Sequence, residues 1–192
     1  MPRSAFIFWI AVGILLCASL FYGVNASQQR RRIHHGGGVL ANGDIVRLDR
    51  VIDGDTVTVV KEGEPPATVR ILGIKALESK VAKDPASILG RASILELERA
   101  MAGRPVRIML NSPPKDSRGR YLATLFVNDR DMGLGLVRGG LALVYPVYPF
   151  PALSLYLHEQ ELARAGKKGL WGEPEVKRRA IALMEEWQGQ AQ

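Results

Sequence analysis

The sequence has very little cysteine or histidine. Its single cysteine, Cys17, excludes an intrachain disulfide and leaves the redox compartment open. Two of the three histidines, His34 and His35, stand together before three glycines. Such a context offers no ordered scaffold for a metal ion, so we assign both to a solvated tether. The sequence also shows no internal repeat, and a repeat architecture is therefore not expected.

Apolar and positively charged side chains are plentiful instead. Hydrophobic residues make up 47% of the 192, which allows one domain of ordinary size with a real core, plus a tail. The formal net charge is +7. A basic excess favours polyanionic partners such as nucleic acids or acidic lipid, although many soluble proteins are as basic and bind neither.

The first 43 residues divide into an apolar run and a polar one. Residues 5–24 carry no charge and have about the length of roughly 20 residues that a helix needs to cross a bilayer. We interpret residues 1–26 as an uncleaved membrane anchor, because the run exceeds the roughly 7–15 residues of a signal-peptide core. The alternative is a signal segment cleaved after Ala26. Residues 27–43 are polar, basic and glycine-rich, which predicts a flexible linker.

A folded domain is predicted over residues 44–172. Short β-rich runs separated by turn residues cover residues 45–48, 51–52, 56–60, 68–74, 106–110 and 121–127. Helices are predicted over residues 86–101 and 152–165. The first shows helical spacing at Ile88, Ala92, Leu95 and Arg99. Strands followed by helices predict an α+β fold, here a five-stranded OB-fold-like β-barrel with packed helices, preceded by one N-terminal transmembrane helix.

The tail, residues 173–192, contains one more amphipathic pattern over residues 175–188. Its apolar face is formed by Val176, Ala180, Ile181, Met184 and Trp187. We expect a helix that packs on the domain or binds a protein partner, whose identity the sequence leaves unknown.

Five short motifs follow one another in the domain. The first is the acidic turn Asp53-Gly54-Asp55, which alone would be an ordinary turn. The second, RILGIKALE, begins at Arg70 and ends at Glu78, and the third, DSRGR, ends at Arg120. The last two are LVRGGLALVY at residues 136–145 and GLW at residues 169–171. In this order the motifs resemble those of the staphylococcal nuclease (thermonuclease) family, over roughly residues 44–171.

The resemblance implies phosphodiester hydrolysis with one calcium ion, a glutamate and two arginines. Asp55 matches the family's first metal carboxylate, Asp53 a nearby acid of the outer shell, and the Ala76 backbone carbonyl a further calcium ligand. Arg70 and Arg120 match the two arginines. Planar, permanently charged guanidinium groups suit phosphate binding and the stabilisation of charge on the leaving side.

Glu78 matches the glutamate that positions or deprotonates the attacking water. Tyr148 lies where the family places an aromatic ring near the nucleotide. Tyr145 and Trp171 are predicted to be core residues. The resemblance thus makes Arg70, Glu78 and Arg120 the candidate catalytic residues.

The sequence departs from the family pattern at Lys75, where the resemblance leads us to expect an aspartate that binds calcium, and at Leu77, where it leads us to expect proline. An ammonium group repels the ion, so calcium affinity is expected to collapse. Lys75 is predicted to pair with Asp55 instead, or to bind phosphate as a point charge. The candidate nucleic-acid contacts are therefore Arg70, Lys75, Arg120 and Tyr148.

Three functions stay open on these grounds. The first is a membrane-associated thermonuclease-like enzyme with altered ligands, or one that uses Lys75 in place of the ion. The second is a catalytically impaired module that binds nucleic acid or a nucleotide, with single-stranded DNA or RNA as the expected partner. The third is a membrane-tethered adaptor domain that uses its tail helix as a contact surface.

The side of the membrane that the domain faces is also open. Arg30, Arg31 and Arg32 follow the apolar run, whereas only Arg3 precedes it, and positive charge normally stays cytoplasmic. The family resemblance implies export instead. We expect a single-pass protein with its domain on the periplasmic or extracellular side, the alternatives being the cytoplasmic face and secretion after cleavage.

Overall fold

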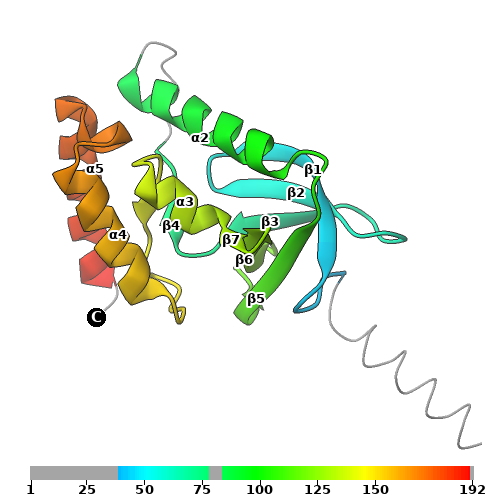
Figure 1. Ribbon diagram of the computed structural model, residues 1–192. Helices are drawn as coiled ribbons and strands as arrows, with labels where there is room; N and C mark the ends of the chain where they lie inside the picture. The colour runs from blue at the N-terminus through cyan, green and yellow to red at the C-terminus, as the bar shows by residue number, and fades with distance from the viewer. Residues whose placement is uncertain (1–38, 78–83, 191–192) are drawn as a thin grey trace, which may run out of the picture. The chain divides into compact units, whose positions relative to one another are not determined.

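The computed structural model describes residues 39–77 and 84–190 (Figure 1). The predicted membrane segment, residues 5–24, and the cleavage site at Ala26 lie outside these residues. Within them, no helix has the length and apolar character that crossing a bilayer requires. The compact unit begins at Val39, and Leu40 is already in its core with 1% of its surface exposed, so folded structure starts before the predicted end of the linker at residue 43.

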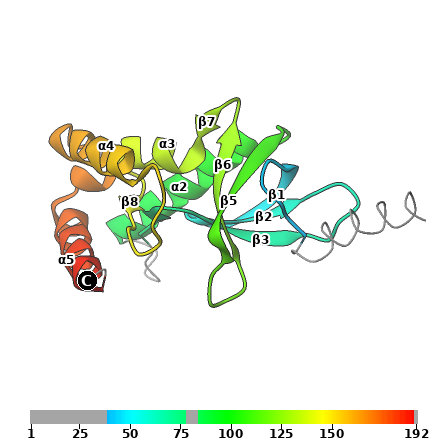
Figure 2. The ribbon, with the colours of Figure 1, turned by 90° about the horizontal axis from the view of Figure 1, so that it is seen from below.

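Five strands form a closed ring, and helices α4 Leu153–Ala165 and α5 Pro174–Gln190 lie toward one side of it (Figures 1 and 2). The ring strands are β1 Ile45–Asp53, β2 Thr56–Val60, β3 Ala67–Ile71, β5 Val106–Lys115 and β6 Tyr121–Val127. Their order is β3-β2-β1-β5-β6, and β6 pairs back with β3 to close the ring. That closing pair is parallel, with Arg70 opposite Leu122, and the other four pairs are antiparallel. The predicted α+β class and the ring of five strands are confirmed.

Alternating apolar side chains fill the ring. Val57, Val59, Val69, Ile71 and Ile108 are completely buried. β-branched residues suit the pleated strand surface, and a closed ring leaves few strand edges unpaired. A short strand, β7 Arg130–Asp131, extends the sheet beyond β6.

The expected single strand over residues 68–74 is divided in two. Gly73 has a φ of 77°, and a Cβ there would lie 2.3 Å from the Phe150 ring, so the chain turns at this glycine. After the turn, β4 Ile74–Lys75 pairs with β8 Leu143–Val144 in a separate two-stranded sheet. Arg70 and Lys75 therefore come from different sheets, although they are five positions apart in sequence.

Four α-helices and one 3-10 helix occur in the described part of the chain. They are α2 Pro85–Met101, α3 Met132–Arg138, α4 Leu153–Ala165, α5 Pro174–Gln190 and the 3-10 helix η1 Gly169–Trp171. Asp84 caps α2 by accepting a hydrogen bond from the Ala86 amide, and Pro85 at the first helical position stabilises the same end. Asp131 caps α3 through the Leu134 amide. Helix α3 was not predicted, because it is short and contains two glycines.

Helix α2 presents a different face to the ring than its large apolar residues suggest. Ile88 and Leu95 are 59% and 60% exposed, whereas Gly90, Ser93 and Leu97 are buried. Small residues let α2 approach closely. A Cβ added to Gly54 would lie 2.6 Å from the Ala76 Cβ and 2.8 Å from the Ser93 Cβ. The glycine of the acidic turn therefore allows the close packing of three segments.

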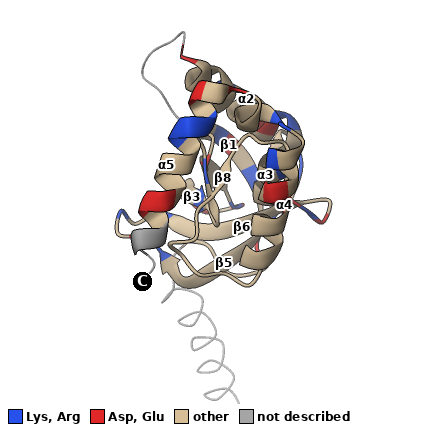
Figure 3. Ribbon diagram, turned by 90° about the vertical axis from the view of Figure 1, so that its left-hand side faces the viewer, with Lys and Arg blue, Asp and Glu red and all other residues tan. Residues whose placement is uncertain are grey.

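The C-terminal helix is part of the packed unit. Val176, Ala180 and Trp187 of α5 are buried in a second apolar cluster with Leu170 and Trp171 of η1, as the predicted apolar face requires. Helices α5 and α4 stand on either side of one end of the ring (Figure 3). The first half of α5 carries Glu175 together with Lys177, Arg178 and Arg179, and its second half carries Glu185 and Glu186.

Candidate functional site

Asp55 lies at the centre of the site and is completely buried. It is the last residue of the turn between β1 and β2, and its amide donates to Asp53 Oδ1 over 2.9 Å. Its Oδ1 accepts hydrogen bonds from Arg70 Nη1 at 2.9 Å and Thr56 Oγ1 at 3.0 Å. Its Oδ2 accepts one from the Ala76 amide at 3.1 Å and pairs with Lys75 Nζ at 3.1 Å. The predicted pair of Lys75 and Asp55 is confirmed.

The two cations decide the charge state of this buried carboxylate. Burial alone would raise the pKa of Asp55, but the charges of Arg70 and Lys75 and the hydrogen bonds of Lys75 and Ala76 bring it below the ordinary value of 3.8. Neighbouring Asp53 is half-buried, and burial together with the charge of Asp55 raises its pKa. Asp55 is therefore a fixed counter-charge for two cations.

The turn that contains Arg120 is stabilised by hydrogen bonds to the Asp116 side chain. Asp116 Oδ1 accepts from the amides of Arg118 and Arg120, each at 3.0 Å, and Oδ2 accepts from Arg120 Nε at 2.8 Å. Although burial raises the pKa of Asp116, these hydrogen bonds and the Arg120 charge lower it overall. Arg120 Nη1 also donates to Thr56 Oγ1 at 3.3 Å. The Thr56 hydroxyl thereby links Arg120 to Asp55.

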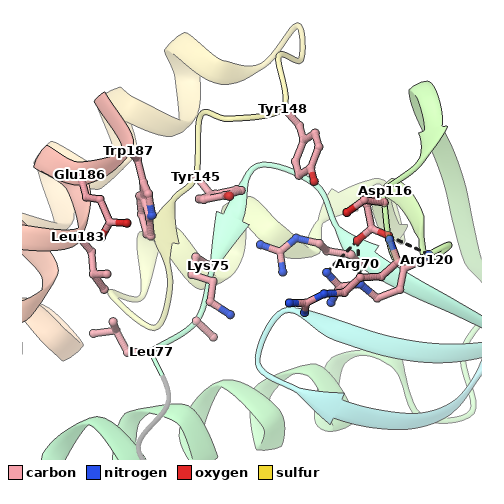
Figure 4. A pocket seen from close by; sticks show the side chains of 13 residues that line it. Arg70, Lys75, Leu77, Asp116, Arg120, Tyr145, Tyr148, Leu183, Glu186 and Trp187 are labelled. Atoms are coloured by element: carbon pink, nitrogen blue, oxygen red, sulfur yellow. Dashed lines mark hydrogen bonds and ion pairs between the residues drawn. The ribbon is translucent and has the colours of Figure 1, made fainter. Parts of the chain in front are cut away.

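The partners of Asp55 and the Arg120 turn border one pocket of about 480 Å³, which Arg70, Lys75 and Arg120 line (Figure 4). Its lining has four cationic side chains and two carboxylates. The cations are Arg70, Lys75, Arg118 and Arg120, and the carboxylates are Asp116 and Glu186. The remaining side chains of the lining are mostly apolar or aromatic and include Leu77, Tyr145, Tyr148, Leu183 and Trp187. The site residues predicted from separate motifs, Arg70, Lys75, Arg120 and Tyr148, thus share a single pocket.

An aromatic group stands beside the cations. The Arg70 guanidinium lies 5.2 Å from the centre of the Tyr145 ring, within cation–π range. Tyr148 lies 6.1 Å from Tyr145, between ring centres, and Trp187 of α5 meets Tyr145 edge-on at 4.9 Å. Trp171 is buried as predicted. Tyr145 is half-buried and packs against the same apolar cluster, in keeping with the predicted core position, and it also lines the pocket.

Two predicted site positions receive no role from the structure. Glu78 lies outside the described residues. Ala76 was expected to offer its backbone carbonyl to calcium, and what the structure shows is its amide bound to Asp55. The roles in catalysis assigned to Arg70, Glu78 and Arg120 stay predictions.

The described residues do not fit a calcium ion. Calcium binds several oxygen ligands. Both oxygens of Asp55 are already engaged by donors, and Lys75 holds its ammonium 3.1 Å from Oδ2, where it repels a cation. No cluster of three or more His, Cys, Asp or Glu side chains that could bind a metal occurs in residues 39–77 and 84–190.

Several residues of the pocket were missed in the sequence. Leu183, Glu186 and Trp187 come from α5, for which only a packing or partner role was expected. The presence of Trp187 on the buried face of an amphipathic helix predicted packing but not the surface on which it packs. The sequence predicts Asp116 only as part of a turn motif. The signal for its role is its position two residues before Arg118 and four before Arg120, from which its carboxylate accepts hydrogen bonds from both amides.

Comparison with known proteins identifies the family. A family model described as "Staphylococcal nuclease homologue" matches residues 68–173, from β3 to the residue before α5. A thermonuclease of Staphylococcus intermedius is 31% identical over 128 residues, which cover 67% of this chain and 75% of that protein. Endonuclease YncB of Bacillus subtilis is 30% identical over 129 residues, 66% of this chain and 61% of that protein. An uncharacterized endonuclease of Haemophilus influenzae is 30% identical over 127 residues, 66% of each chain. The chain therefore belongs to the staphylococcal nuclease homologue family.

Proposed function

We propose that this protein binds single-stranded DNA or RNA, with the backbone phosphates held in the cationic part of the pocket. The observation that carries the proposal is the convergence of Arg70, Lys75, Arg118 and Arg120 on one pocket beside two tyrosines. Arginine and lysine bind phosphate oxygens, and aromatic rings stack on bases whatever their sequence. The net charge of +7 favours the same partner.

Two further features support nucleic acid as the ligand. The five-stranded ring with one parallel closing pair is an arrangement of the OB-fold type, a fold that takes oligonucleotides in its grooves. The relatives named above are a thermonuclease and two endonucleases, so phosphodiester hydrolysis is the ancestral reaction.

We propose further that calcium-dependent cleavage is lost or very weak. Asp55 is the described carboxylate on which the calcium site would depend, and two cations and two further donors occupy its oxygens. The Lys75 ammonium provides positive charge at the place of the ion, and its side chain, 34% exposed, lines the pocket. The pocket is thus suited to hold a phosphate without a metal ion.

Arg118→Ala tests the phosphate contact with the least risk to the fold, because Arg118 is exposed. We expect the variant to bind a labelled single-stranded oligonucleotide about three- to tenfold more weakly at low salt. Its slope of log K against log salt should be shallower by about 0.7, the loss of one phosphate contact. Fluorescence anisotropy across a salt series measures both quantities.

The matched control is Arg178→Ala, which removes the same charge from an exposed position of α5 outside the pocket lining. Equal losses in the two variants would show that only general charge matters. If the parent protein binds no oligonucleotide at low salt, the proposal fails and the adaptor function becomes the leading one.

We also propose that residues 5–24 anchor the protein in the membrane, with the domain on the periplasmic or extracellular side. The support is the uncharged run itself and the export expected for the family. The protein should be recovered in the membrane fraction, and protease added to cells from which any outer membrane has been removed should degrade the domain. Protection of the domain would place it in the cytoplasm, and release into the medium would show cleavage.

A further inference from the structure

Helix α5 reaches the pocket although it lies beyond the matched family segment, which ends at residue 173. Its position is fixed at both ends. Near its start, Arg179 Nη1 pairs with Asp84, the cap of α2, at 2.6 Å. Near its end, Trp187 is 7% exposed and packs edge-on against Tyr145. The helix is therefore a firm wall of the pocket.

The pocket has two chemically different halves (Figure 4). Arg70 and Arg120 lie on one side, Leu183, Glu186 and Trp187 of α5 lie on the other, and Lys75 and Tyr145 lie between them (Figure 4). Without α5 the apolar part of the lining would keep Ala76, Leu77 and the two tyrosines. The volume of the whole pocket, about 480 Å³, is in the range of pockets that hold small organic ligands.

A nucleotide has the same division, with a flat, largely apolar base at one end and an anionic phosphate at the other. Tyr145 contacts residues of both halves. Its ring centre lies 4.9 Å from that of Trp187, with the two ring planes nearly perpendicular, and 5.2 Å from the Arg70 guanidinium. A base seated against Leu183 and Trp187 would thus place its own phosphate beside Arg70 and Lys75.

We propose that α5 builds a nucleobase subsite next to the phosphate-binding half, with Leu183 and Trp187 as specificity-determining residues. The inference rests on the proposed binding of nucleic acid and adds a requirement for a base. According to this proposal, α5, which follows the matched family segment, contacts the ligand directly.

The test compares two probes on three proteins. The probes are a labelled single-stranded oligonucleotide and a strand of equal length in which every nucleotide is abasic. The parent should bind the first at least tenfold more tightly, since stacking on side chains contributes this much per base. Leu183→Ala should weaken binding of the normal strand about fivefold and leave the abasic strand unchanged.

Met184→Ala is the matched control, because Met184 is the next residue, equally half-buried in the same apolar cluster, but absent from the pocket lining. It should change the affinity for neither probe. Trp187→Phe, which keeps an aromatic ring, should bind the normal strand more tightly than Trp187→Ala does, at equal affinity for the abasic strand.

Three results would overturn the inference while leaving phosphate binding intact. They are equal affinity of the parent for both probes, equal losses for both probes in Leu183→Ala, and equal effects of Leu183→Ala and Met184→Ala. Failure of the parent to bind either probe would instead refute the proposed function on which the inference rests.

Discussion

Asp55→Asn is expected to lower the free energy of unfolding by about 3–5 kcal/mol, the cost of leaving buried charge without its partner. The carboxylate is completely buried between Arg70, which is 7% exposed, and Lys75. An amide keeps the shape but cannot balance either cation. For a unit of this size, the melting temperature should fall by roughly 6–20 °C. Thermal and urea denaturation of parent and variant measure the difference.

The effect should depend on pH in a defined direction. The pKa of Asp55 is lower in the folded than in the unfolded protein. Its stabilisation is therefore fully present above the unfolded-state pKa of about 3.9 and is lost as the pH falls through the folded-state pKa. The difference in free energy of unfolding between the parent and Asp55→Asn should become smaller only below about pH 4. The control is Asp49→Asn, at an exposed position of β1, which should show neither effect. If Asp55→Asn has the same free energy of unfolding as the parent, the role given to Asp55 is contradicted.

Lys75→Asp is expected to create a calcium response that the parent lacks. The substitution removes the ammonium beside Asp55 Oδ2 and adds a second carboxylate at the position where the family resemblance expects one. At a calcium concentration of about a hundred times the dissociation constant, the ion should stabilise the variant by about 2.7 kcal/mol. Thermal denaturation with calcium and with chelator measures this shift, and calcium-dependent cleavage of single-stranded DNA should accompany it.

Lys75→Met is the control, because it removes the ammonium without adding an oxygen ligand. It should gain no calcium response. If the parent is stabilised by calcium as much as Lys75→Asp, or cleaves as fast, Lys75 does not exclude the ion and our interpretation of Asp55 is wrong.

The ring was predictable because its strands are short apolar runs between strong turn residues. The predicted bounds of β2 and β6 agree with the structure. The break at Gly73 was not predictable from alternation, since it follows from close packing of Phe150, a residue far along the chain. The buried face of α2 was missed for a related reason. Gly90 and Ser93 are buried because they are small, while Ile88 and Leu95 stay exposed.

For the site, motif order brought Arg70, Lys75 and Arg120 together correctly, and opposite charge predicted the pair of Lys75 and Asp55. The contribution of α5 could not be predicted in the same way. Its apolar face indicates that it packs, but only the tertiary structure shows that Trp187 packs on Tyr145 and places Leu183 in the pocket.

The central claim is that the cationic pocket binds nucleic acid phosphates without calcium. It is tested most directly by titrating the full chain, in detergent or in a bilayer disc, with a labelled single-stranded oligonucleotide in calcium and in chelator over a salt series. We expect equal affinities in calcium and chelator, with a salt slope of about −2 to −3, as three or four phosphate contacts to a single strand require. Binding that appears only with calcium, or no binding at low salt, would contradict the account.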